Sequence, residues 1–198
     1  IVGKRMLHTG VEQGAIGRYV LIPGSVERAR LISEYFDEPQ LLCHNREFLT
    51  YVGTLEGERV AVTSTGIGGP SMAITVEELH GCGADTFIRV GSCASASPKS
   101  KIGDVIIPCG AARMEGVGEH FLPVEFPAVP HYGIFRQMEA AAKACGYPYN
   151  TGVTITKDSY YTESAPETKP VRDELLYKWR AYERAGATNT SMECAPLF

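Results

Sequence analysis

Short apolar runs that end at glycine turns alternate along the chain with stretches whose apolar residues recur at helical spacing. The first run covers residues 19–22 and stops at Gly24, after which Ser25 is placed to cap a helix. Residues 86–90 and 104–108 are two further apolar, strand-like runs. Strands that alternate with helices in this way predict an α/β domain.

One strand pair departs from this alternation. Residues 48–55 and 59–65 flank Glu56-Gly57-Glu58, a combination that predicts a β-hairpin. A hairpin makes an entirely parallel sheet improbable. We therefore expect a three-layer α/β/α fold with a mixed central sheet, built as one domain over residues 1–198.

The remaining elements are predicted from the same two periodicities. Loop-rich segments are expected at residues 113–131 and, as a polar surface loop, at residues 162–170. Helices are expected at residues 135–145, at residues 171–185 and from Ser191 onward, and a strand at residues 152–156. Because the sequence stops as a new element begins, we expect the domain to lack its C-terminal portion.

Composition excludes several classes of protein. The chain has 198 residues, 44% of them hydrophobic, which is enough for one substantial core, and a formal net charge of -4. That charge gives no overall attraction to nucleic acid or to an anionic membrane. The apolar runs are too short to cross a bilayer and the start resembles no signal peptide, so we expect a cytoplasmic protein. The six scattered cysteines have no metal-ligand spacing and predict reduced thiols and no metal site.

Three junctions between a strand and a turn carry groups that suit phosphate. In the first, Gly24 allows close backbone approach at a helix start and Arg28 adds a forked cation. The second, residues 65–71, is rich in glycine but matches neither the P-loop nor the dinucleotide-binding pattern, so ATP and NAD are disfavoured. The third contains Arg89 within an apolar strand, where a charge is costly unless an anion or a carboxylate accompanies it.

Each junction also has a simpler interpretation. Gly24 and Arg28 could form an ordinary turn with a surface arginine, residues 65–71 a structural turn, and Arg89 an internal salt bridge. What favours an anion site is that all three junctions fall at the carboxyl ends of strands, where open α/β sheets bind ligands.

Together, these segments resemble the uridine phosphorylase branch of the nucleoside phosphorylase family over nearly the whole chain. The matching stretches, in chain order, are Pro23-Gly24 with Arg28, Arg46-Glu47-Phe48, residues 64–71, residues 77–79, residues 87–91, residues 103–105, residues 125–129 and Met192-Glu193. The resemblance implies an enzyme, a pentosyltransferase that cleaves a pyrimidine nucleoside such as uridine with phosphate, yielding free base and ribose 1-phosphate in nucleoside salvage.

The resemblance also assigns the site residues. It implies a phosphate pocket, a ribose site and a base site, with Arg28, Arg89 and Glu193 as the catalytic residues. The phosphate pocket would be formed by Gly24, Arg28, Arg89 and Ser92, with Arg46 reaching in from a neighbouring subunit; the ribose site by Ser92, Met192, Glu193 and a neighbour's His8; and the base site by Tyr160, Glu163, Thr168 and Lys169.

Two residues donated in trans agree with the family's assembly, a hexamer built as a trimer of dimers. The partners expected are therefore nucleoside, phosphate and further copies of the chain, with neither nucleic acid nor membrane. No cofactor is expected, although some members of the family hold a monovalent cation between subunits where Glu47, Ile67 and Ser71 fall here.

The sequence departs from the family's pattern on the base side. Family members place a glutamine and an arginine in the loop after the aromatic residue, whereas Glu163 and Thr168 stand here, with Lys169 next to them. An acid and a hydroxyl do not replace those donors, so we hypothesise that base selectivity differs from that for uridine, toward a purine or a broader range. Ser25 in place of the usual aspartate, and residues 93–97 in place of a glycine-rich turn, are two further departures.

Two other functions fit the same fold. A nucleosidase would use water in place of phosphate, but it has little use for the three arginines Arg28, Arg46 and Arg89. A non-catalytic nucleoside-binding protein would retain the ribose residues and tolerate the altered base loop. We expect the phosphorylase because residues for phosphate and for ribose are both retained.

Overall fold

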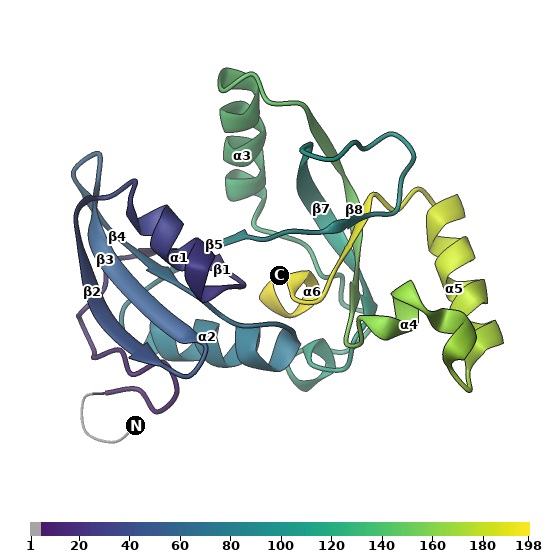
Figure 1. Ribbon diagram of the computed structural model, residues 1–198, viewed down its shortest axis with the longest axis horizontal. Coiled ribbons are helices and arrows are strands. Elements are labelled where there is room, and N and C mark those ends of the chain that lie inside the picture. The colour runs from purple at the N-terminus through teal and green to yellow at the C-terminus, as the bar shows by residue number, and fades with distance from the viewer. Residues whose placement is uncertain (1–4) are drawn as a thin grey trace. The chain divides into compact units, whose positions relative to one another are not determined.

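The computed structural model describes residues 5–198, and the contacts within the chain divide it into two compact units, Ile1–Gly91 and Ser92–Phe198. Each unit has its own mixed β-sheet with helices beside it (Figure 1). The α/β class with mixed sheets is therefore confirmed. The expectation of a single domain stays a prediction. No helix within residues 5–198 is both long enough and apolar enough to span a bilayer.

The first unit is a five-stranded sheet with the order β2-β3-β4-β1-β5. β1 is parallel to β4 and β5, whereas β3 is antiparallel to both β2 and β4. Its elements are β1 (Tyr19–Pro23), α1 (Val26–Ser33), β2 (Asp37–Asn45), β3 (Phe48–Leu55), β4 (Glu58–Thr63), α2 (Gly69–Gly81) and β5 (Thr86–Val90).

Local sequence signals explain the start of α1 and the hairpin. The Ser25 side chain accepts a hydrogen bond from the Arg28 backbone N–H and caps α1, as expected. At the β3–β4 turn, Glu56 and Gly57 have φ angles of 51° and 84°, the left-handed conformation that two-residue hairpins require. The predicted hairpin is thus confirmed.

The second unit is a four-stranded sheet with the order β6-β9-β8-β7, in which β8 is parallel to β7 and β9, and β6 is antiparallel to β9. Its core joins Ile155 of the sheet to Leu175 and Trp179 of the neighbouring helix. The elements are β6 (Ala94–Ser95), β7 (Val105–Met114), η1 (Gly118–His120), α3 (Tyr132–Ala144), β8 (Tyr149–Lys157), α4 (Tyr161–Ser164), η2 (Pro166–Thr168), α5 (Arg172–Arg184), β9 (Asn189–Ser191) and α6 (Cys194–Leu197).

Two predictions about the second unit were wrong. Residues 162–170 are not an irregular loop, since they contain most of α4 and all of η2. The Trp179 indole N–H donates to the Thr162 carbonyl at 3.0 Å and ties this segment to α5. The expected helix from Ser191 is instead the end of β9, which pairs with β8, followed by α6 from Cys194.

Candidate active site

The carboxyl ends of three neighbouring strands meet at one edge of the first sheet. β1 lies between β4 and β5 and runs parallel to both. The Thr65 N–H, just beyond β4, donates to the Pro23 carbonyl at 2.9 Å, and Pro23 is in register with Val90 of β5. The three junctions singled out in the sequence are therefore adjacent, at the edge where parallel strands bind ligands.

Two guanidinium groups lie at this edge, beside Gly24. Arg28 Nη1 donates to the Val90 carbonyl at 3.2 Å, which holds the Arg28 side chain against the end of β5. A Cβ placed on Gly24 would lie 3.6 Å from Arg89 Nη2, so the Arg89 group also faces this turn. Within residues 5–198, Arg28 forms no ion pair with a carboxylate. Arg28 can therefore bind an oxyanion beside the Gly24 turn, which the Arg89 group also faces.

The conformation of Arg89 depends on Gly91. A Cβ on Gly91 would overlap Arg89 Nη1 and lie 3.0 Å from Arg89 Cζ, which is tighter than most contacts of real Cβ atoms. Only glycine lets the guanidinium group fold back over the end of β5.

We expect Gly91→Ala to displace the Arg89 guanidinium group while the protein stays folded, since the overlapping atoms belong to the flexible end of a side chain. Losing one charge-assisted contact of about 1.5–3 kcal/mol should lower kcat/KM for phosphate roughly tenfold or more. Steady-state kinetics and thermal unfolding measure the two effects. Gly110→Ala is the control, because a Cβ there makes only ordinary contacts, the nearest at 3.5 Å; equal activity of both variants would contradict this role of Gly91.

Arg46 lies at the same edge of the sheet, in the turn that joins two other strands, β2 and β3. It is the first residue of the turn between β2 and β3, its side chain is exposed, and β4 and β3 separate this turn from β1. Its φ of 52° is left-handed, which costs a non-glycine residue about 1–2 kcal/mol. An exposed arginine held in an unfavourable conformation is available to a neighbouring molecule.

His8 is fixed by contacts with α2 and with the end of β2. Its ring atom Nδ1 lies 2.7 Å from Glu78 Oε1, and its carbonyl accepts a hydrogen bond from Asn45 Nδ2 at 2.7 Å. Asn45 directly precedes Arg46. The two residues that the resemblance assigns to a neighbouring site therefore belong to one connected piece of the first unit.

Met192 and Glu193, two of the expected ribose residues, lie in the second unit between β9 and α6. Glu193 is 5% exposed, and one of its oxygens accepts a hydrogen bond from the Met192 N–H at 3.3 Å. Met192 is half-buried, and Ser92, at the start of this unit, is exposed. A buried carboxylate at the end of a strand is suited to accept hydrogen bonds from sugar hydroxyls.

Glu163, one of the expected base residues, is already engaged by the protein itself. It forms an ion pair with Lys157, the last residue of β8, and both of its oxygens lie 3.0 Å from the Thr190 hydroxyl. Lys157 also donates to Thr190 at 2.9 Å. Because the Lys157 side chain is only 5% exposed, the Glu163 carboxylate serves first as the counter-ion of a buried ammonium group.

The other expected base residues have more freedom. Tyr160 is 57% exposed, packs edge-on against Tyr161, and has Lys157 Nζ 5.9 Å from its ring centre. The hydroxyl of Thr168 donates to the Ala165 carbonyl at 2.8 Å, and Lys169 Nζ lies 5.9 Å from the Tyr161 ring centre.

The sequence did not single out Lys157, which directly follows the strand expected at residues 152–156 and belongs to a stretch, residues 154–157, that is buried throughout. Its contact with Tyr160 and its pairing with Glu163 place it next to two expected base residues.

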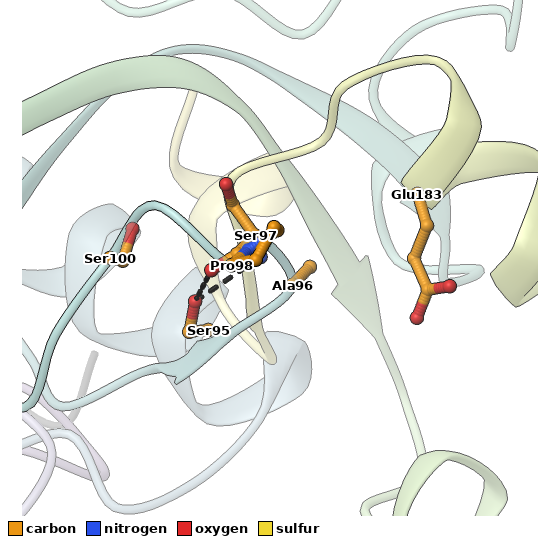
Figure 2. Close-up of a pocket in the computed structure, with 6 residues that line it drawn as sticks. All are labelled: Ser95, Ala96, Ser97, Pro98, Ser100 and Glu183. Atoms are coloured by element: carbon orange, nitrogen blue, oxygen red, sulfur yellow. Dashed lines mark hydrogen bonds between the residues drawn. The ribbon is translucent and has the colours of Figure 1, made fainter.

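A surface hollow in the second unit is lined by none of the expected site residues. Figure 2 shows it between the loop that follows β6 and the end of α5, with the Ser95 hydroxyl donating to the Ser97 carbonyl at 2.7 Å. Hydroxyls and the Glu183 carboxylate line it, with no cation. This hollow is therefore unsuited to phosphate.

Two of the residues expected near a cation adjoin Gly66. A Cβ on Gly66 would lie 3.0 Å from Glu47 Cγ and 3.7 Å from the Ser71 hydroxyl oxygen, while Ile67 is 77% exposed. Carboxylate, hydroxyl and carbonyl oxygens suit a hard cation. Within residues 5–198, no group of three or more histidine, cysteine, aspartate or glutamate side chains is placed to hold a metal ion.

The chain is similar in sequence to known nucleoside phosphorylases. The chain is 44% identical over 191 residues to uridine phosphorylase of Treponema pallidum, an alignment that covers 96% of this chain and 74% of the relative. It is 33% identical over 191 residues to guanosine phosphorylase of Halorubrum lacusprofundi, covering 96% and 75%.

The fold is similar to that of a solved structure. The crystal structure of uridine phosphorylase from Vibrio fischeri superposes with a TM-score of 0.89 at 30% identity, covering 99% of this chain and 78% of that one. The family model described as the phosphorylase superfamily matches residues 18–198. This chain therefore belongs to the phosphorylase superfamily.

Proposed function

We propose that the protein is a nucleoside phosphorylase, a pentosyltransferase that transfers the sugar of a pyrimidine nucleoside such as uridine to inorganic phosphate. The observation that carries this proposal is the convergence of Arg28 and Arg89 on the Gly24 turn. The relatives named uridine phosphorylase support the same reaction.

Phosphate is a weak nucleophile toward the anomeric carbon, so the site has to hold it and align it. Positioning of this kind lowers a barrier by about 7–11 kcal/mol in the best cases. The Arg28 and Arg89 guanidinium groups are the holders, and Arg46 completes them from a neighbouring subunit. Ser92 lies two residues beyond the end of β5 in sequence and adds a hydroxyl.

The sugar gains positive, oxocarbenium-like charge as the glycosidic bond breaks. The Glu193 carboxylate accepts hydrogen bonds from the ribose hydroxyls, so it both orients the ring and stabilises that charge. Burial of Glu193 strengthens this interaction because the local dielectric constant is low. Met192 packs beside the ring.

The departing base develops negative charge on its carbonyl oxygens and needs donors there. Glu163 is no such donor, since it accepts from Lys157 and Thr190. The expected donors that remain are the Tyr160 hydroxyl and the Lys169 ammonium group, because the Thr168 hydroxyl already donates to the Ala165 carbonyl. We therefore propose a base preference that differs from strict uridine selectivity, and the relative named guanosine phosphorylase keeps a purine or a broad range open.

Phosphorolysis assays test both parts of the proposal. Uridine, thymidine, inosine, guanosine and adenosine are each offered with phosphate and in phosphate-free buffer. We expect turnover only with phosphate and with more than one base. Equal turnover without phosphate would identify a nucleosidase, binding without turnover a nucleoside-binding protein, and exclusive use of uridine would refute the altered selectivity.

Assembly is part of the proposal. His8 and Arg46 are given to a neighbouring copy in a hexamer arranged as a trimer of dimers. Five apolar side chains between η1 and α3 are exposed by 41–55%, which supports association through this surface; they are Phe121, Leu122, Val124, Phe126 and Val129. A monovalent cation held by Glu47, Ser71 and the Ile67 carbonyl would tie two copies together. Nucleoside salvage in the cytoplasm stays a prediction.

A further inference from the structure

The Glu78 side chain holds the segment that carries His8. Its two oxygens accept hydrogen bonds from the His8 N–H at 3.0 and 3.2 Å, from the Thr9 N–H at 2.7 Å and from the Thr9 hydroxyl at 2.8 Å. The His8 Nδ1 atom lies 2.7 Å from Oε1. One carboxylate on α2 thus binds both backbone N–H groups, the Thr9 hydroxyl and the His8 ring.

These contacts determine the charge of Glu78. Burial of the side chain, which is 14% exposed, raises the pKa of the carboxyl, but the hydrogen bonds from Thr9 and His8 outweigh burial and hold the pKa below its usual range. Glu78 is therefore an anion at neutral pH, and an anion only accepts hydrogen bonds. Consequently His8 Nδ1 is the donor of this contact, and a neutral His8 ring has its proton there.

A neutral imidazole with its proton on Nδ1 presents a lone pair at Nε2. The His8 side chain is 34% exposed, so solvent or a second molecule can reach the ring. The other side of the segment is fixed as well, because Asn45 Nδ2 donates to the His8 carbonyl and Cys43 Sγ to the Thr9 carbonyl at 3.3 Å.

We propose that Glu78 is a positioning residue that sets the tautomer of His8, so that Nε2 is the ring atom left to accept from a sugar hydroxyl in a neighbouring subunit's site, the contact that the resemblance implies for His8, at the 5′ position. This inference rests on the proposed function. A nucleoside whose 5′ position carries no donor gains nothing from Glu78.

Nitrogen-15 NMR of the full chain tests the tautomer without any catalysis. The His8 signals are identified as those absent from His8→Ala. We expect the Nδ1–H form in the unmodified protein and a mixture of tautomers in Glu78→Gln, whose amide can donate as well as accept. A predominant Nε2–H form in the unmodified protein would overturn the proposal, whether or not the variant folds.

Kinetics test the consequence for substrate. We expect Glu78→Gln to raise KM for a nucleoside with a 5′-hydroxyl roughly tenfold, the value of about one hydrogen bond, and to change KM for its 5′-deoxy analogue less than twofold. Glu77→Gln removes the same charge from an exposed neighbour on α2 and should change neither. Equal increases in KM for the nucleoside and for its 5′-deoxy analogue would show that Glu78 has a merely structural role.

The two experiments separate the possible failures. If the unmodified chain phosphorolyses no nucleoside, the proposed function fails, and with it the contact between Nε2 and substrate. If phosphorolysis occurs but the tautomer is wrong, the role of Glu78 fails alone.

Discussion

Arg89→Ala should lower kcat/KM for phosphorolysis by about 100- to 10,000-fold. The guanidinium group presents two donors to one oxyanion, and each charge-assisted hydrogen bond is worth about 1.5–3 kcal/mol, or a factor of ten for every 1.4 kcal/mol. The loss should appear both in KM for phosphate and in kcat, because the same group holds and aligns the nucleophile. Steady-state kinetics at varied phosphate concentration measure it.

Arg18→Ala is the matched control for this experiment. Arg18 directly precedes β1, at the opposite end of that strand from Gly24, and forms an exposed ion pair with Asp85, so its removal should leave phosphorolysis within about twofold of the unmodified protein. Arg89→Lys keeps the charge but loses the fork, and should fall between the two. Retention of normal phosphate dependence in Arg89→Ala would remove Arg89 from the phosphate site.

Lys157→Met should have the largest effect on stability. It leaves the Glu163 carboxylate facing the Thr190 hydroxyl without its buried counter-ion. Breaking a buried ion pair by removing one partner costs about 3–5 kcal/mol, and the lower end applies because the Glu163 side chain is 23% exposed. Chemical denaturation measures the free energy of unfolding.

The double variant Lys157→Met with Glu163→Leu provides the comparison. Replacing both partners of such a pair with apolar side chains is close to neutral, so the double variant should recover most of the lost stability. A double variant as unstable as the single one would show that packing of the Lys157 stem, rather than its charge, matters. An unfolding free energy of Lys157→Met unchanged from the unmodified protein would contradict the ion pair.

The first unit shows what sequence patterning predicts well. Apolar runs, the glycine turns and the Glu56-Gly57 hairpin signal act locally, so the strand ends and the convergence of Gly24, Arg28 and Arg89 could be predicted. β2 was not predicted, because this edge strand is mostly exposed and polar and contains a proline, features that periodicity does not recognise as a strand.

The expected base site depends on tertiary contacts that the sequence pattern does not reveal. The pairing of Lys157 with Glu163 depends on α4 turning back toward the end of β8, and its third member, Thr190, comes from a strand 33 residues beyond Lys157. α4 and η2 are too short for helical periodicity to show, and their polar composition is typical of a loop. Tertiary contacts such as that between Trp179 and Thr162 order this segment instead.

A crystal structure of the protein grown with phosphate shows whether arginines from separate segments gather around one inorganic oxyanion. We expect phosphate oxygens within hydrogen-bonding distance of the Arg28 and Arg89 guanidinium groups and of the Gly24 N–H, with Arg46 supplied by an adjoining copy. Phosphate bound elsewhere, with Arg28 and Arg89 each turned toward a carboxylate of the protein, would contradict the account.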